Sequence, residues 1–216
     1  MSGTPSPQPN TAETLSLNDI LADSLHSHYI DDAYYAKLRH DFREWDQRGK
    51  PLDASERDAY EAVILHENWL LDRQAFEAWY RLYTKECVYW VPAGKPSRDP
   101  GTIDPRKNVT IAFDDRRRMG DRIVWLRTGV ASAQLPVSQT THISAGFVRV
   151  PSANPAEIKI RSQFVLHEIR GGHPMQTLAG WMGHVLVEQD GAIRIDRKLV
   201  CLLDADRARH NPTFLI

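Results

Sequence analysis

The 216-residue sequence predicts an α+β fold in which helices come first and an antiparallel sheet follows. Apolar residues recur at helical spacing in the first half, as shown by Phe76, Trp79, Tyr80 and Tyr83. The last third instead alternates apolar and polar residues, most cleanly over 157–169. A strongly curved sheet wrapped around the helices would form a cone with an internal pocket.

Four helices are expected before the sheet. Ser16 can cap a helix that runs to about His28, because a serine hydroxyl accepts from the first free backbone N–H groups. The other three are expected from Asp31 or Asp32 to about Gly49, from Asp53 or Ser55 to about Asp72, and from Phe76 to Tyr83. We divide the chain into a disordered segment over 1–14, a helical arm over 15–54 and a cone domain over 55–216.

The strands are expected after residue 86. A β-rich run at 87–91 ends at Pro92, and 93–108 is expected to be a long surface loop. Asp114 or Asp115 can cap a helical segment before the main sheet. The main strands are expected over 141–150, 157–169, 176–188 and 192–203, with turns at Gly171-Gly172 and Asp190-Gly191.

Composition excludes several classes of protein. Lys and Arg number 27 and Asp and Glu number 28, so the chain lacks the basic excess of a non-specific nucleic-acid binder. The N-terminus has no basic and apolar signal-peptide pattern, and no apolar run reaches the roughly 18–20 residues that span a bilayer. We therefore expect a cytoplasmic protein that binds neither nucleic acid nor membrane.

The two cysteines limit the redox chemistry of the chain. Neither Cys87 nor Cys201 belongs to a C-x-x-C pair, which excludes a Cys-ligated zinc finger. A Rieske centre needs two Cys and two His at paired spacings, and these are absent as well. Any iron–sulfur chemistry must therefore belong to another chain, and both cysteines are expected to be buried in strands.

Four sequence blocks together resemble one family. They are HENWLLDRQAFEAWY (66–80) followed by CVYWVP (87–92), FDDRRRMGDRIVWLRTG (113–129), ASAQLPVS (131–138), and a tail from Asp196-Arg-Lys to Ile216. In this order, and over roughly residues 55–216, the blocks resemble the β (small) subunit of aromatic-ring-hydroxylating dioxygenases. The arm before residue 55 is longer than in that family, and Pro212 replaces a usual Leu or Ile.

This resemblance implies a SnoaL-like (NTF2-like) cone and a partner. In that family the α subunit carries a Rieske [2Fe-2S] cluster and a mononuclear Fe(II), the complex is often α3β3, and the β subunit is usually structural. We therefore expect no cofactor on this chain and a β trimer formed through the sheet. The pair Asp23 and His26 matches half of the α-subunit iron motif, which we interpret as chance.

The same fold also hosts enzymes, so a stand-alone SnoaL-like isomerase, dehydratase or hydrolase is the alternative. Such enzymes place acids, His and Tyr in the pocket, where burial tunes their pKa for proton transfer. The candidates are His66, Asp72, Tyr89, His142 and His167. We favour local hydrogen bonding for each of them, because a fold alone does not establish a function. A binding module for a small hydrophobic ligand is a third, weaker interpretation.

Other residues suggest metal binding or subunit contacts. His167, Glu168 and His173 could ligate a metal, but they flank a Gly-Gly turn, which favours a solvated hairpin. The basic cluster Arg116, Arg117, Arg118 and Arg122 favours a solvated helix face, with contact to an α subunit as the alternative. Trp90 and Trp181 are candidate interface anchors. The apolar tail around Phe214 is a candidate for burial in a neighbouring subunit.

Overall fold

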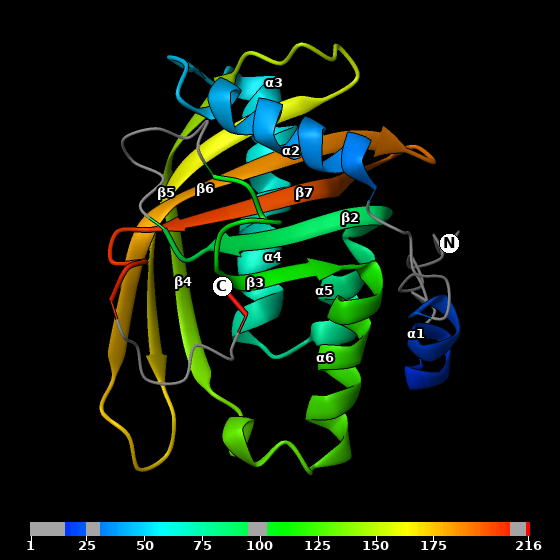
Figure 1. Ribbon diagram of the computed structural model, residues 1–216, viewed down its shortest axis with the longest axis vertical. Coiled ribbons are helices and arrows are strands. Elements are labelled where there is room, and N and C mark those ends of the chain that lie inside the picture. The colour runs from blue at the N-terminus through cyan, green and yellow to red at the C-terminus, as the bar shows by residue number, and fades with distance from the viewer. Residues whose placement is uncertain (1–15, 25–30, 95–102, 208–214) are drawn as a thin grey trace, which may run out of the picture.

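A computed structural model describes residues 16–24, 31–94, 103–207 and 215–216. A seven-stranded, strongly curved sheet forms the body of the molecule, with strand order β1-β4-β5-β6-β7-β2-β3 (Figure 1). All neighbouring strands are antiparallel except β2 and β7, which run parallel. The strands are β1 (Lys50–Pro51), β2 (Tyr83–Pro92), β3 (Thr110–Asp115), β4 (Gln139–Val150), β5 (Ile158–Ile169), β6 (Gln176–Gln189) and β7 (Ala192–Leu202).

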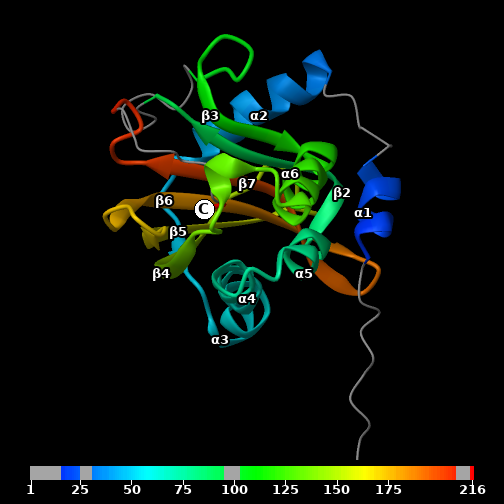
Figure 2. The ribbon, with the colours of Figure 1, turned by 90° about the horizontal axis from the view of Figure 1, so that it is seen from below.

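Helices cover both faces of this sheet. Figure 2 shows α2 on one face and the helices α4 and α5 on the other, inside the curve. The helices are α1 (Leu17–Ser24), α2 (Asp32–Trp45), α3 (Ala54–Glu56), α4 (Ala62–Asp72), α5 (Phe76–Arg81) and α6 (Arg116–Thr128). The expected α+β cone is confirmed, and no helix in the described part of the chain is long and apolar enough to cross a membrane.

The expected helix starts are set by side-chain caps. The Asp31 carboxylate accepts from the backbone N–H of Tyr34 at 2.8 Å, and Asp115 caps α6 in the same way. Asp53 and Glu56 form a reciprocal capping box. The helix expected to run unbroken to Asp72 is interrupted, because a π-helical turn over Arg57–Glu61 separates α3 from α4.

Apolar and polar residues alternate along β5 and face opposite sides of the sheet, as expected. Ile160, Phe164 and Leu166 point into the cone and are buried there. The opposite side carries Arg161 and His167, which are only partly buried. The hairpin between β6 and β7 turns at Asp190 and Gly191, both with positive φ, as this two-residue turn requires.

Two sequence predictions about elements are wrong. Tyr83 fits the helical spacing of α5, yet it begins β2, because α5 ends at Arg81 and the Tyr83 ring packs edge-on against Trp79. Strand β3 was not expected at all, since its six residues lie between a loop and a cap signal. The helical segment expected after Asp114 or Asp115 is the helix α6, which ends at Gly129 with φ 71°.

The arm packs on its own sheet. Trp45 of α2 is buried against Gly183 of β6, where a Cβ atom would lie 2.8 Å from the indole. Lys159, which the alternation places on the outer face, is fully buried because α2 covers it. Its ammonium group pairs with Asp41 at 2.7 Å and with Glu44. Helix α2 of the N-terminal arm therefore covers part of the outer face over β5 and β6.

Candidate functional site

The interior of the cone holds a fully buried polar cluster centred on Glu67 of α4. The indole N–H of Trp79 donates to the Glu67 carboxylate at 3.1 Å, and the Tyr83 hydroxyl also donates to it. Nε2 of His184 and Nζ of Lys198 each lie 3.0 Å from Oε2 of Glu67. Five elements therefore meet at one carboxylate: α4, α5, the start of β2, β6 and β7.

The charges of this cluster are fixed by burial and pairing. Burial opposes ionisation of Glu67, but Lys198 and the contact from His184 outweigh it and hold the Glu67 pKa well below its usual range. Burial lowers the pKa of His184, so this imidazole is neutral. The cluster is thus a carboxylate–ammonium pair with a neutral histidine. Its carboxylate is already saturated by donors, which suits a structural role better than proton transfer.

Glu67, His184 and Lys198 were not among the residues that the sequence pointed to. Glu67 lies between His66 and Asn68 on a helix whose polar residues are interleaved with its apolar ones in the sequence. His184 and Lys198 occupy alternating positions in long strands, and polar residues there usually face water. One signal could have found them: alternate residues of a strand share a face, so His184 lies on the same face as Met182, and Lys198 on the same face as Val200. Met182 and Val200 are core residues, which predicts that the polar pair also points inward.

Two of the five pocket candidates are brought together. Nδ1 of His142 on β4 lies 2.6 Å from Oδ1 of Asp72, the last residue of α4. Asp72 also accepts from the Thr140 hydroxyl at 2.9 Å and from the backbone N–H of His142. Burial opposes ionisation of Asp72, yet these bonds lower its pKa overall. The pair joins α4 to β4.

The other three candidates lie apart from this pair. His66 is exposed and stacks on Trp69 at 5.8 Å between ring centroids. Nδ1 of His167 contacts the Thr177 hydroxyl across the β5–β6 pair at 2.9 Å. The buried hydroxyl of Tyr89 bonds to the chain's own tail. The five residues therefore do not converge on one pocket.

No group of three or more potential metal-ligating side chains occurs among the described residues. Glu168, predicted to be a solvated residue beside His167, is buried and bonds to Ser138 at 2.5 Å and to Gln176 at 2.8 Å. These bonds tie the β5–β6 hairpin to the segment before β4. Cys87 and Cys201 are free thiols buried in strands, as the sequence predicted.

The basic cluster splits into an internal and an external half. Arg116 is buried, donates to the carbonyl groups of Tyr80 and Tyr83, and lies 3.4 Å over the Tyr80 ring. Arg122 pairs with the buried Asp114 at 2.6 Å. Arg117 and Arg118 are exposed on α6. The prediction of a solvated face is therefore wrong for Arg116, whose donors bind backbone inside the chain.

Trp90 and Trp181 have different environments. Trp90 is only 2% exposed, in the apolar layer beneath α2, where it meets Phe113 edge-on. It therefore presents no surface to a neighbouring subunit. Trp181 is partly exposed and lies under the Arg161 guanidinium at 4.8 Å.

Trp181 belongs to a shallow groove on the outer sheet face that α2 leaves uncovered. The groove has a volume of about 640 Å³ and crosses β4, β5 and β6. Two leucine-sized side chains stand exposed in it, Ile143 at 52% and Leu203 at 72%. We call this surface the outer groove. Contiguous apolar exposure of this kind is typical of an interaction surface.

Most of the six Trp residues are expected in the core by default, but two on the helices are exposed. Trp69 on α4 is 51% exposed and Trp125 on α6 is 56% exposed. Arg73 lies 4.8 Å above the Trp69 ring. The expectation holds for Trp45, Trp79 and Trp90, which are buried.

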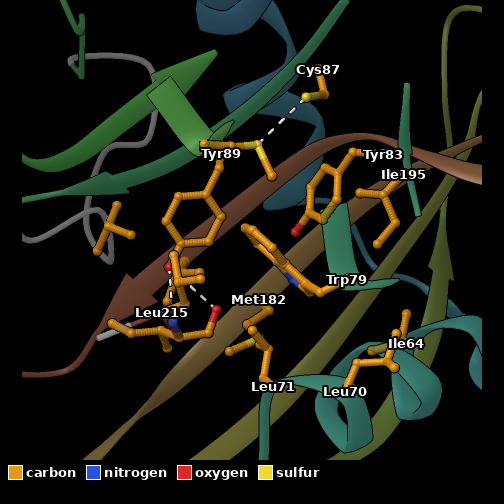
Figure 3. Close-up of a cluster of buried hydrophobic side chains, with 14 of the residues drawn as sticks. Ile64, Leu70, Leu71, Trp79, Tyr83, Cys87, Tyr89, Met182, Ile195 and Leu215 are labelled. Atoms are coloured by element: carbon orange, nitrogen blue, oxygen red, sulfur yellow. Dashed lines mark hydrogen bonds between the residues drawn. The ribbon is translucent and has the colours of Figure 1, made fainter. Parts of the chain in front are cut away.

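The apolar tail ends inside its own chain. Leu215 and Ile216 are buried in the interior core, so the expected burial in a neighbouring subunit is wrong for these two residues. Figure 3 shows Leu215 near the ring of Tyr89, on the side of Met182 and Leu71. Phe214, the tail residue singled out from the sequence, lies outside the described residues, as do residues 1–14 and His26.

Comparison with known proteins gives a consistent result. Residues 66–207 match the family model described as ring hydroxylating beta subunit. The small oxygenase component of the p-cumate 2,3-dioxygenase system of Pseudomonas putida is 32% identical over 154 residues, which cover 71% of this chain and 82% of that protein. The 2-halobenzoate 1,2-dioxygenase small subunit of Burkholderia cepacia is 33% identical over 107 residues, covering 49% of this chain and 62% of that protein.

Solved structures show the same fold. A chain of naphthalene 1,2-dioxygenase with indole bound in the active site aligns with a TM-score of 0.66 and 18% identity, over 91% of this chain and 98% of that one. The beta subunit of benzoate 1,2-dioxygenase from Burkholderia mallei aligns with a TM-score of 0.56 and 22% identity, over 77% and 99%. These likenesses confirm the NTF2-like cone.

Proposed function

This chain belongs to the ring-hydroxylating dioxygenase β-subunit family, and from that premise we propose how it works as the small subunit of such an enzyme. The observation that carries the proposal is the family match over residues 66–207, which includes every strand of the cone except β1. The subunit acts as a rigid support for a larger α subunit. The saturated Glu67 cluster fits this role, because it ties five elements together.

The redox chemistry belongs to the partner. In our proposal the α subunit carries the Rieske [2Fe-2S] cluster and the mononuclear Fe(II), where O2 reacts with the substrate. The sequence supports this division, since its two cysteines form no Rieske pair. The whole complex resides in the cytoplasm. Its substrate is an aromatic carboxylic acid, the class named for the p-cumate and 2-halobenzoate relatives.

The assembly is an α3β3 hexamer with a β trimer. The outer groove supports a contact between copies of this chain, because Ile143 and Leu203 are apolar and exposed there. The exposed guanidinium groups of Arg117 and Arg118 on α6 are proposed contacts with the α subunit, where they can pair with carboxylates.

Co-expression with a ring-hydroxylating dioxygenase α subunit from the same organism tests the proposal. The expected result is a complex with equal numbers of both chains, a native mass of three copies of each, and dioxygenase turnover that requires the α subunit. The isolated β chain should contain no iron by metal analysis. Stoichiometric iron in the isolated chain, or turnover of an aromatic acid by it alone, would contradict the proposal.

A further inference from the structure

The register of the strands divides the outer sheet face into a covered zone and an open zone. One row of outward-facing residues lies under α2 and consists of Lys159, Val185 and Arg197. A second row lies open in the outer groove and consists of Ile143, Val165 and Ala179. Between these two rows, Arg161 of β5 stands opposite Gly183 of β6. The outer groove therefore begins where α2 ends.

Trp45, the last residue of α2, lies on the boundary between the two zones. Its indole packs on Gly183, and its ring centroid lies 6.4 Å from that of Trp181, which lines the outer groove. Arg161 contacts both tryptophans, because its guanidinium donates to the Trp45 carbonyl at 3.1 Å and lies 4.8 Å over the Trp181 ring. We call Arg161 and Trp181 the groove wall. This wall is attached to the end of the arm.

The chemistry of the outer groove fits a second copy of this chain. Of the described residues that line it, only Arg161 carries a charge, and its guanidinium already contacts the end of α2. The rest of the groove is mostly apolar and includes the exposed side chains of Ile143 and Leu203. The whole chain has a formal net charge of -1, so two copies repel each other very little.

We infer that the arm prepares the contact between copies: α2 holds the groove wall in the conformation that a second copy binds. The inference rests on the proposed trimer and adds to it a dependence on the arm. Side chains that are ordered before association lose less entropy when the copies meet. Lys159, paired with Asp41 and Glu44 beneath α2, keeps the arm in place without lining the outer groove. Tight trimer formation therefore requires a docked arm.

Sedimentation equilibrium of the full-length β chain tests this dependence. Gly183→Ala pushes a methyl group against the Trp45 indole, although Gly183 does not line the outer groove. We expect the concentration at which half of the chains are trimeric to rise roughly tenfold, because Trp181 and Arg161 must then be ordered during association. The matched control is Asp72→Asn, which removes a contact between α4 and β4 and leaves α2 in place. It should leave this concentration unchanged.

The groove wall can also be followed in chains diluted until they are monomeric. Acrylamide should quench the fluorescence of Trp181 more strongly in Gly183→Ala than in the unaltered chain, because a loosened arm no longer covers one side of this indole. Parallel measurements on Trp181→Phe chains identify the share of the signal that comes from Trp181. If Gly183→Ala does not fold by circular dichroism, Trp45→Phe replaces it, since the smaller ring weakens the contact with Trp181.

The outcomes separate this inference from the proposed function. An unaltered chain that stays monomeric at all concentrations would overturn the proposed trimer and the inference together. A trimer that forms equally well in the unaltered chain and in the arm variant would overturn the inference alone. Equal weakening of the trimer by Asp72→Asn would overturn it as well, because a general loss of stability would then explain the effect. Unchanged quenching of Trp181 in the arm variant would show that α2 does not hold the groove wall.

Discussion

The ammonium group of Lys198 and the carboxylate of Glu67 lie 3.0 Å apart, and neither side chain is exposed. Lys198 belongs to β7, the last strand along the chain, which lies between β6 and β2 in the sheet. Glu67 belongs to the inner helix α4. Removing two charges from water is costly, and their mutual attraction offsets that cost. Loss of either charge would leave the other buried without a partner. This relationship makes the interior of the cone sensitive to single substitutions.

Glu67→Gln is expected to lower the free energy of unfolding by about 3–5 kcal/mol, because it leaves Lys198 buried without an opposite charge. Urea denaturation measures this loss. The double variant Glu67→Gln with Lys198→Met removes both charges and should recover a large part of it. A double variant less stable than Glu67→Gln alone would show that the ion pair is not the source of the effect.

Stability should fall as the pH is lowered through about 6.5, the ordinary value for histidine. Burial lowers the folded-state pKa of His184, so the unfolded chain takes up a proton that the folded chain refuses. The slope from this residue is at most about 1.4 kcal/mol per pH unit. Urea titrations between pH 7.5 and 5.5 should show a smaller slope in His184→Gln than in His66→Gln, a control at an exposed position.

Gly183→Ala is expected to loosen the arm, because its new methyl group would meet the Trp45 indole at 2.8 Å. Overpacking of this kind costs about 1–3 kcal/mol. Limited proteolysis should cleave α2 faster in this variant, and urea denaturation should show the lower stability. Gly94→Ala is the control, since nothing lies within 4 Å of its added Cβ. Equal cleavage rates in the two variants would contradict the proposed packing.

Asp72→Asn tests whether the Asp72–His142 pair only supports the fold or also takes part in dioxygenase turnover. Asp72 joins α4 to β4 through His142 and Thr140, so its loss should lower stability by about 1–3 kcal/mol. Turnover by the assembled dioxygenase at a temperature where the variant is folded should be unchanged. A fall in turnover without a fall in the amount of complex would favour proton transfer by Asp72 and His142.

Leu203→Glu is expected to prevent trimer formation by placing a charge in the outer groove. Sedimentation equilibrium of the β chain should then give the mass of a monomer. Val109→Glu is the matched control, because Val109 is 78% exposed but lies away from the groove residues. A trimer that survives Leu203→Glu would show that the copies meet through another surface.

Local signals account for what the sequence could predict. Caps such as Asp31 and Asp115 act within three residues, and the parity of β5 is set by neighbours along one strand, so both are visible in the chain. The features that were missed depend on distant partners. Lys159 looked exposed because nothing near it in sequence shows that Asp41 and Glu44 cover it.

The candidate site follows the same division. Asp72 and His142 could be named from residue type, but their pairing depends on α4 lying against β4, across 70 residues of sequence. Glu67 could not be singled out by residue type from its polar neighbours His66 and Asn68 on α4, because its partners come from α5, β2, β6 and β7. Leu215 and Ile216 are buried in their own chain, and their apolar character alone could not show which chain would bury them.

The parallel pairing of β2 with β7 has a consequence for synthesis on the ribosome. Thr84 and Asp196, which bond across these strands, are 112 residues apart in sequence. Until β7 has emerged from the exit tunnel, β2 has one unpaired edge, and Glu67 lacks its ion-pair partner Lys198. The nascent chain therefore exposes an unpaired strand edge, which can pair with other chains, while most of the cone is already translated. Chaperone binding and early association with partner subunits would protect this edge from aggregation.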